Sequence, residues 1–393
     1  MPQRASNPTA MHGPRAGLDG AALSRWIIDT CTRSDADGGL GFTAAGVCAA
    51  DAPPAEDVAV LDKWLKTDRG TMDYMSAQAA ERIDPTQVLS NVQSVVMVAD
   101  RYASRDGGID ATAEADRADG LLRGRVARYA RGRDYHATIK RRVHRLADSL
   151  RAAFPTEAFR TFVDTAPVLE RRFAQRAGIG WLAKNAMLIH PVHGSYLLLG
   201  GLFTTLRLPE PPQSEQPTHT DHCGTCTRCI DACPTSAIAA QPLAGAPGSR
   251  PRIDGSRCIS YLTIEHEGVI DPALAERTGD WVFGCDVCQE VCPHNSPRPG
   301  QPDASVRDEY TPQRATLPIL QMADWKSADR SLLTVSSMKR ATAEMFRRNA
   351  ALALASSYRQ TRDPAALQRL RGMLNDECAV VAQTAAMAVA SLG

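Results

Sequence analysis

The sequence predicts three successive parts: an α/β domain, a cysteine-rich segment and an all-helical tail. Before about residue 205, short β-branched runs alternate with amphipathic stretches, which is typical of packed strands and helices. Eight of the eleven cysteines fall between Cys223 and Cys292. Beyond about residue 330 the pattern is helical. A chain of 393 residues is too long for one comfortable core, which agrees with this division.

Composition and charge exclude two classes of protein. The formal net charge is +1, so the chain is not a globally basic nucleic-acid binder, which still leaves room for a local basic face. No apolar run reaches the ~18 residues that a membrane-spanning helix needs. The first 20 residues lack the apolar core of a secretory signal. We therefore expect residues 1–20 to be a flexible leader. We expect the protein to be cytoplasmic, without a membrane partner.

The α/β domain is expected over residues 21–212. Apolar spacing predicts amphipathic helices at 21–31, 57–66 and 135–154. Alternating or continuous apolar runs predict strands at 94–99, 159–164, 186–189 and 196–203, with a strand or loop at 39–47. The strand at 159–164 is expected to run straight into a helix that has Pro167 in its first turn.

Proline-rich breaks at 205–222, 241–252 and 293–304 predict loops. They place the cysteine-rich domain at 213–300 and the tail at 301–393. In the tail, AALALAS at 350–356 and AAMAVAS at 385–391 are offset by 35 residues, which indicates a HEAT-like helical repeat. Two alanine-rich helices that look alike only in composition are the alternative.

The cysteine spacing is that of bacterial two-cluster ferredoxins. Cys223-x2-Cys226-x2-Cys229-x3-Cys233-Pro234 is the complete run, and Cys285-x2-Cys288-x3-Cys292-Pro293 repeats its end. Cys258 is the spare cysteine between the halves. We therefore expect two 4Fe–4S clusters, one on Cys223, Cys226, Cys229 and Cys292 and the other on Cys233, Cys258, Cys285 and Cys288. Zinc, which favours separated cysteine pairs, is the alternative. The remaining cysteines, Cys31, Cys48 and Cys378, are expected to be small buried hydrophobic residues.

Clusters of this kind carry single electrons and make no bonds. An electron carrier needs only the cluster domain, yet some 220 residues precede it here. The large N-terminal domain is therefore expected to hold the site that uses the electrons.

Several strings resemble epoxyqueuosine reductases, the cobalamin-dependent family that completes queuosine synthesis in tRNA. They lie at 83–102, 129–136, 162–204, 258–268 and 284–295, and in the helical tail. The strings VDTAPVLER and CISYLTIE are the most specific. The resemblance implies an α/β cobalamin-binding domain like that of reductive dehalogenases, a two-cluster ferredoxin domain and a HEAT-like tail that helps hold the tRNA anticodon stem-loop.

The reaction that the resemblance implies is reduction of epoxyqueuosine to queuosine and water at the wobble position, with two electrons and two protons. An external low-potential donor such as flavodoxin or ferredoxin is implied as a partner, and we expect a monomer. Since a bare alkoxide is a poor leaving group, a general acid is needed. Asp164 matches the family's catalytic aspartate, and we expect desolvation to keep it protonated. Capping of a helix that begins near Pro167 is its alternative role.

The resemblance also implies contacts to cobalamin and to tRNA. The cobalamin contacts are Arg82, Tyr135, Asp164, Lys184, Leu188, Leu199 and Asp286. Without the resemblance, the leucines are core residues and Lys184 is an exposed loop lysine. His136 and His190 are not assigned as cobalt ligands. The implied tRNA contacts in the tail are Lys339, Arg340, Arg348 and Asn349.

Two basic stretches agree with tRNA binding. Residues 123–151 contain ten lysines and arginines against two acids, and residues 326–371 contain ten against three. Contacts to phosphates release counterions and make binding tight and salt-sensitive. Solvated helix faces are the alternative for either stretch alone.

Three rival functions predict different properties. A reductive dehalogenase would share the corrinoid and clusters but carry a twin-arginine signal, which is not found in the sequence. A plain electron-transfer subunit would bind no corrinoid. A tRNA-binding protein with structural clusters would bind tRNA without any need for reduction.

Overall fold

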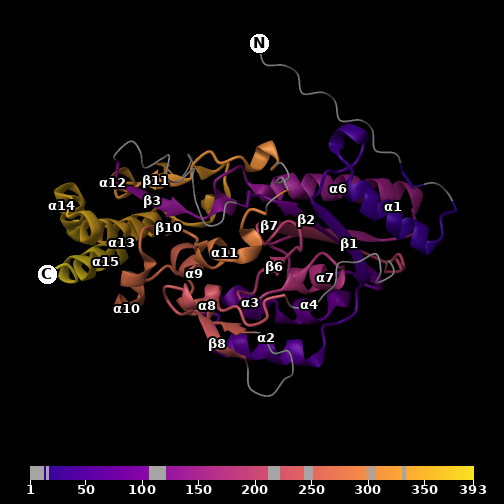
Figure 1. Ribbon diagram of the computed structural model, residues 1–393, viewed down its shortest axis with the longest axis horizontal. Helices are drawn as coiled ribbons and strands as arrows, with labels where there is room; N and C mark the ends of the chain where they lie inside the picture. Colours follow the sequence, from indigo (N-terminus) through magenta and orange to yellow (C-terminus); the bar gives the residue numbers. More distant parts are fainter. Residues whose placement is uncertain are drawn as a thin grey trace, which may run out of the picture.

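The computed structural model describes residues 13–14, 17–105, 121–210, 222–242, 251–298, 300, 306–329 and 333–393. Most of the leader and parts of the three proline-rich breaks lie outside the described residues. In Figure 1 the N-terminal part, indigo to magenta, occupies one end of the molecule, and the yellow C-terminal helices occupy the other. The orange cysteine-rich segment lies between them.

The helices and strands follow the predicted order of parts. The longer helices are α1 (Gly20–Thr32), α2 (Ala55–Thr67), α6 (Tyr135–Ala153), α7 (Glu170–Arg176), α13 (Ala343–Thr361), α14 (Pro364–Gly372) and α15 (Ala379–Ala390). The short helices are α3 (Asp73–Ala77), α4 (Ala79–Ile83), α8 (Arg228–Asp231), α9 (Ile259–Ile264), α10 (Pro272–Ala275), α11 (Val287–Glu290) and α12 (Ile319–Met322). The strands are β1 (Ala44–Ala49), β2 (Ser94–Arg101), β3 (Arg123–Val126), β4 (Phe159–Val163), β5 (Trp181–Leu182), β6 (Leu188–Ile189), β7 (Leu197–Thr204), β8 (Ile238–Pro242), β9 (Pro251–Ile253), β10 (Trp281–Phe283) and β11 (Thr316–Pro318).

A four-stranded sheet in the order β1-β2-β7-β4 is the core of the N-terminal part. All of its strand pairs are antiparallel. Every residue of β2 is buried, because Val96 and Val98 face one layer of helices while Val95 and Met97 face another. The apolar run at 94–99 is therefore a central strand buried on both faces, as predicted.

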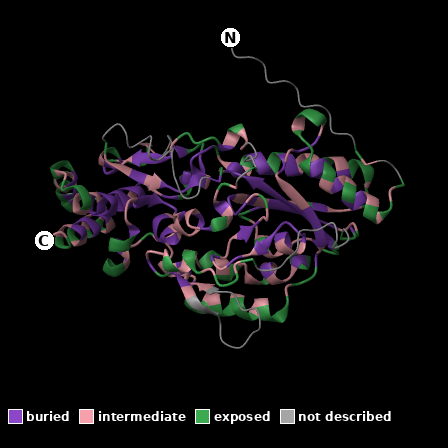
Figure 2. Ribbon diagram, viewed as in Figure 1, coloured by how far each residue is buried: buried purple, intermediate pink, exposed green. Residues whose placement is uncertain are grey.

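Helices cover both faces of this sheet. The buried stripes of α1 and α6 pack on one face, and α7 packs on the other (Figure 1). The α6 stripe is the predicted one, with Ile139, Val143, Leu146 and Leu150 all buried. In Figure 2 the strands of this sheet are mostly purple, whereas α1 and α2 show exposed outer faces. The arrangement is the predicted mixture of strands and helices, built on an antiparallel sheet.

The link from β4 to α7 differs from the prediction. The helix begins at Glu170, so Pro167 lies ahead of it rather than in its first turn. Asp164 directly follows β4 and has a φ of +38°, in the left-handed region that non-glycine residues avoid. Two tight turns then follow, with Thr165 N donating to Val163 O and Val168 N to Ala166 O. The strained residue and the turns hold this segment as a loop.

A three-stranded sheet joins the three predicted parts. Strand β3 pairs in parallel with β10 of the cysteine-rich segment and antiparallel with β11 of the tail. Its apolar side chains belong to the same core as α13 and α15. The C-terminal part is helical as predicted, with AALALAS inside α13 and the repeated string in α15.

No helix in the described part of the chain is long and apolar enough to cross a membrane.

Candidate active site and iron–sulfur centre

The electrostatic neighbours of the clustered cysteines agree with the two predicted sets, although no three of these side chains are close enough to one another in the described residues to hold a metal ion as they stand, so the ligand sets stay a prediction. Cys229 experiences the charges of Cys223, Cys226 and Cys292, which defines one set. Cys258 experiences the charge of Cys233, and Cys288 experiences those of Cys285 and Cys258, which defines the other. The charge of Cys229 also acts on the Cys288 thiol, so the two sets are neighbours. None of these cysteines is in a disulfide.

The two sets differ in burial. Burial raises the pKa of Cys229 to about 11, and it raises those of Cys285 and Cys288 well above the usual range. The short helix α8, which contains Cys229, has no buried residue, and its Arg228 is exposed. The set with Cys223 and Cys229, which we call the outer set, therefore lies near the surface. The set with Cys258 and Cys288, the inner set, has more protein packed around Cys258, Cys285 and Cys288, although its four cysteines are partly exposed and the buried Cys292 belongs to the outer set.

Lys184 belongs to the outer set's surroundings. Its Nζ donates to the carbonyl oxygens of Gly224 and Cys226, at 2.6 and 3.0 Å. Asn185 likewise donates to Cys288 O at 3.2 Å. The loop that contains Lys184 thus hydrogen-bonds to the backbone of the cluster-binding segments. Lys184 is partly buried rather than a fully exposed loop lysine, and its contact with cobalamin stays a prediction.

Asp286 lies between two inner-set cysteines and is almost completely buried. Its Oδ2 accepts from Arg128 N at 2.6 Å, and its Oδ1 accepts from Gln289 at 3.2 Å. Burial raises its pKa, which the nearby Arg131 and Arg128 oppose. The carboxyl group therefore connects the inner set to the 3₁₀ turn of residues 128–130 in the α/β part.

Asp164 is held by the N-terminus of α6. Its Oδ2 accepts from the Tyr135 hydroxyl at 2.7 Å and lies 3.2 Å from His136 Nε2. The side chain is 54% exposed, so it also faces open space. No helix begins where Asp164 could cap it, and the capping alternative is wrong.

A second carboxylate fixes the same histidine. Asp134 is the N-cap of α6, and its Oδ1 accepts from His136 N at 3.1 Å and lies 2.7 Å from His136 Nδ1. Its Oδ2 accepts from Lys339 Nζ at 2.5 Å. The rings of Tyr135 and His136 stack with centroids 4.1 Å apart. The result is a continuous chain, Lys339–Asp134–His136–Asp164.

The electrostatics of this chain differ from the expected desolvated acid. Burial alone would raise the pKa of Asp164, but the hydrogen bonds from His136 and Tyr135 outweigh it and lower the pKa. Burial would lower the pKa of His136, but Asp134 and Asp164 raise it to about 9. At neutral pH the shared proton therefore resides on His136, and Asp164 is a carboxylate.

Two further titratable groups, Glu170 and Arg82, interact electrostatically with Asp164. Burial raises the pKa of Glu170 to about 8, helped by the charge of Asp164. Glu170 also accepts a hydrogen bond from the Asp164 backbone, which supports the left-handed conformation there. Arg82 is buried, and its Nε has no hydrogen-bond partner within the described residues. Burial lowers the pKa of Arg82, while the charges of Glu170 and Asp164 raise it.

The predicted leucines lie in the core layer under the loop. Leu188 in β6 is buried beside Phe173 and Ile179, and Leu199 in β7 packs partly buried against the same cluster. Both are therefore core residues, and Gly200, the neighbour of Leu199, pairs with Val163 directly before Asp164.

The tail residues separate into two kinds. Lys339 and Arg340 have half-exposed side chains, and Arg340 pairs with Glu265 at 2.8 Å. Arg348 and Asn349 are completely buried. Arg348 donates to Leu262 O at 2.5 Å and to Gly268 O at 3.0 Å, and Asn349 donates to Thr263 and Val282 carbonyls. The prediction that Arg348 and Asn349 contact tRNA is wrong, because they brace the cysteine-rich segment from inside.

Part of the first basic stretch is also structural. Arg142 is buried in an ion pair with Asp100, and Arg131 donates to Val126 O at 2.8 Å. Arg125 pairs with Glu290 at 2.5 Å. The exposed members that could meet phosphates include Arg133, Lys140 and Arg141. The count of lysines and arginines in residues 123–151 is therefore larger than the number of basic side chains at the surface.

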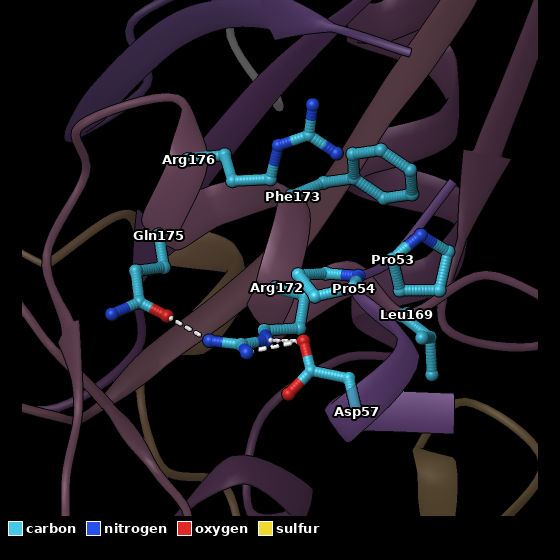
Figure 3. A pocket seen from close by; sticks show the side chains of 8 residues that line it. All are labelled: Pro53, Pro54, Asp57, Leu169, Arg172, Phe173, Gln175 and Arg176. Atoms are coloured by element: carbon cyan, nitrogen blue, oxygen red, sulfur yellow. Dashed lines mark hydrogen bonds and ion pairs between the residues drawn. The ribbon is translucent and has the colours of Figure 1, made fainter. Parts of the chain in front are cut away.

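A small apolar cavity of about 230 Å³ lies between the start of α2 and α7 (Figure 3). The Arg172 guanidinium crosses it to pair with Asp57, with Nε and Oδ2 2.5 Å apart. None of the predicted site residues lines it. It is below the usual range of small-molecule sites, ~300–1,000 Å³, and does not seat a corrinoid.

The sequence patterns point neither to Asp134 and Glu170 as site residues nor to His136 as a hydrogen-bond partner of Asp164. The available signal was the GRDYH string, in which an aspartate precedes the first residue of a predicted helix. That pattern predicts an N-cap. It does not predict that the loop after β4 returns to the same helix end.

Comparison with known proteins gives consistent results. The family model described as epoxyqueuosine reductase QueG, DUF1730, matches residues 82–165, and the one for a 4Fe-4S double cluster binding domain matches residues 222–295. An epoxyqueuosine reductase of Xanthomonas campestris is 37% identical, covering 90% of this chain and 93% of its own length. One of Alicycliphilus denitrificans is 36% identical, covering 89% and 94%.

Two solved structures extend the comparison. One is an epoxyqueuosine reductase with an epoxyqueuosine-modified tRNA-Tyr stem loop, with a TM-score of 0.73 and 28% identity over 90% of this chain and 87% of that one. The other is a Bacillus subtilis epoxyqueuosine reductase whose catalytic loop is swung out of the active site, with a TM-score of 0.73, 27% identity and coverage of 90% and 87%. The extent of the match to the Xanthomonas relative settles the family: this chain is a member of the epoxyqueuosine reductases.

Proposed function

We propose that this chain reduces epoxyqueuosine to queuosine at the wobble position of tRNA, with Asp164 as the proton donor. The observation that carries the proposal is the clasp of Asp164 by Tyr135 and His136 in a domain joined to a double cluster binding segment. Proton donors and electron carriers are the two components that removal of an epoxide oxygen as water requires. Membership of the family and the tRNA-bound relative support the same substrate.

Cobalamin is the proposed centre between these components, and when bound it supplies low-potential electrons to the substrate. The residues fit such a group. Arg82 offers a buried, unpaired Nε, judged over the described residues, and Asp164 faces open space. Tyr135, Lys184, Leu188, Leu199 and Asp286 are the other proposed neighbours, with Lys184 acting by holding the cluster loop.

Electrons are proposed to enter through the outer set and to leave through the inner set. The outer set lies near the surface, where an external low-potential carrier such as flavodoxin or ferredoxin can approach it. The inner set lies beside the buried Asp286, which accepts a hydrogen bond from Arg128 of the α/β part. Two neighbouring clusters in this order divide the path into two shorter electron-transfer steps.

The proton side depends on this chain's own groups. Tyr135 and His136 orient the Asp164 carboxylate, which directly follows β4 on a left-handed backbone. Protonation of the departing epoxide oxygen lowers the barrier to C–O cleavage. A general acid contributes about 10²–10⁴ to the rate of such a step.

The proposed organisation is a leader at 1–20, a cobalamin-binding domain at 21–212, related in fold to reductive dehalogenases, a ferredoxin-like domain at 213–300 and a HEAT-like tail at 301–393. Helices α13 and α15, which contain the repeated string, pack against each other in the tail. Lys339, Arg340 and the exposed arginines near α6 would contact the tRNA backbone. We propose a cytoplasmic monomer, in the compartment where tRNA is modified.

The test combines cluster-loaded protein, cobalamin, a chemical reductant and tRNA carrying epoxyqueuosine, followed by nucleoside mass spectrometry. Queuosine should form only with cobalamin present. No queuosine while both clusters are reduced would refute the proposal. Corrinoid binding with dehalogenation of aryl halides instead would favour a reductive dehalogenase, and absence of corrinoid binding would favour an electron carrier.

A further inference from the structure

His136 bridges two carboxylates at the N-terminus of α6. Its Nε2 lies 3.2 Å from Asp164 Oδ2, and its Nδ1 lies 2.7 Å from Asp134 Oδ1. A neutral imidazole has one N–H, so only the imidazolium donates to both carboxylates. The site is therefore built to hold a proton next to Asp164.

We propose, on the basis of the function proposed above, that His136 is a positioning residue that stores a proton and passes it to Asp164 during each turnover. The epoxide oxygen leaves as water, so two C–O bonds break, one C=C bond forms, and two electrons and two protons are consumed. The reduced clusters supply the electrons. The Nε2 proton of His136 moves to Asp164 and from there to the oxygen; the neutral ring takes a second proton from water, and the transfer repeats.

Asp134 makes this cycle repeatable. It holds Nδ1 of the ring and the backbone N–H of His136 at once, so the ring cannot turn away when Nε2 has lost its proton. Lys339 occupies the other oxygen of Asp134, and the Tyr135 ring stacks on the imidazole. These contacts hold the imidazole ring in one orientation before and after it gives up its proton.

The charged and titratable groups that face His136 come from three elements. Asp134 and Tyr135 lie on α6 with it, and Asp164 comes from the loop after β4. Lys339 reaches it through Asp134, while Glu170 and Arg171 act through Asp164. Burial lowers the pKa of His136, but the two carboxylates raise it to about 9. The ring is thus loaded at neutral pH, in agreement with the geometry.

The kinetic test is a single-turnover pH profile of the holoenzyme with epoxyqueuosine-containing tRNA, for His136→Gln and a matched control. The control is His144→Gln, on the same helix, whose Nε2 lies 3.3 Å from the Thr161 hydroxyl. The wild type and the control should lose activity only as pH rises through about 9. His136→Gln should be slower by about 10²-fold, and its rate should already decline with pH below 7. A slower variant with the wild-type profile would refute the proton-storing role.

A second measurement needs no turnover. Ring ¹H–¹⁵N spectra of the oxidised, cluster-loaded protein assign the His136 signal by its loss in His136→Gln. A titration midpoint near 9, moving downward in Asp134→Asn, supports the proposal. A midpoint at or below 6.5 overturns it. If neither wild type nor His144→Gln makes queuosine, the proposed function fails, and the ring titration still decides whether His136 stores a proton.

Discussion

Lys339 in the tail donates a 2.5 Å hydrogen bond to Asp134, the residue that caps the helix carrying Tyr135 and His136. The two residues are 205 positions apart in the sequence. This contact attaches the start of the C-terminal helical region to the end of α6 that holds Asp164. A group expected to meet tRNA thus lies three contacts from the group expected to give a proton.

Replacing Asp164 by asparagine should abolish turnover without loss of the cofactors. Asparagine retains the shape and can accept from Tyr135, but its amide cannot deliver a proton. We expect at least a 10²-fold loss of single-turnover rate, with unchanged cluster and corrinoid absorption spectra. Asp148→Asn, on the exposed side of α6, is the control. Wild-type turnover in Asp164→Asn would remove Asp164 from its role.

Replacing Cys288 by alanine should remove the inner cluster. The wild-type protein should contain about eight iron atoms per chain, four in each cluster. Cys288→Ala should contain about four or fewer, because a cluster with three thiolates is labile. Cys378→Ala, at the start of α15 and far from both sets in sequence, should keep about eight. Iron analysis with electron paramagnetic resonance distinguishes the outcomes, and full iron in Cys288→Ala contradicts the ligand assignment.

The double variant Lys339→Ala, Arg340→Ala should weaken tRNA binding and reduce its dependence on salt. Each lost phosphate contact lowers the slope of log K against log salt by about 0.7–0.9. Fluorescence anisotropy with a tRNA stem-loop at several salt concentrations measures this slope. Lys66→Ala, an exposed lysine on α2, is the control. An unchanged slope in the double variant argues against contact through the tail.

Sequence patterns predict the helices and the kind of cluster domain well because both depend on local spacing. The spacing of Ile139, Val143 and Leu146 predicts the buried face of α6, and the cysteine spacing predicts a double cluster binding domain, whose individual ligands stay a prediction. The protonation state of Asp164 could not be predicted, because it depends on where a loop meets the end of a distant helix. The burial of Arg348 could not be predicted either. It depends on which face of α13 packs against the cysteine-rich segment, a contact between parts that are distant in the sequence.

Arg348 provides a stability test of that correction. Its guanidinium donates hydrogen bonds to carbonyl oxygens of the cysteine-rich segment, among them those of Leu262 and Gly268. Burial lowers the pKa of Arg348 to about 10. Arg348→Ala leaves these acceptors unpaired, which should cost about 2–4 kcal/mol and lower the thermal midpoint by several degrees. The salt slope of tRNA binding should not change. Arg371→Ala, exposed on α14, is the matched control.

The charge on His136 should also make stability depend on pH. Its pKa in the folded chain is about 9, above an ordinary 6.5, so its stabilising effect is complete below pH 6.5 and is lost as pH rises through 9. His136→Gln removes this contribution, which we expect to be on the order of 1 kcal/mol after screening by solvent. The gap in thermal midpoint between wild type and His136→Gln should therefore be largest near pH 6 and nearly close by pH 10. His144→Gln should show no such closing, because no carboxylate pairs with the His144 ring in the part of the chain that the structure describes. A gap that widens with pH would mean that the ring is neutral in the folded chain.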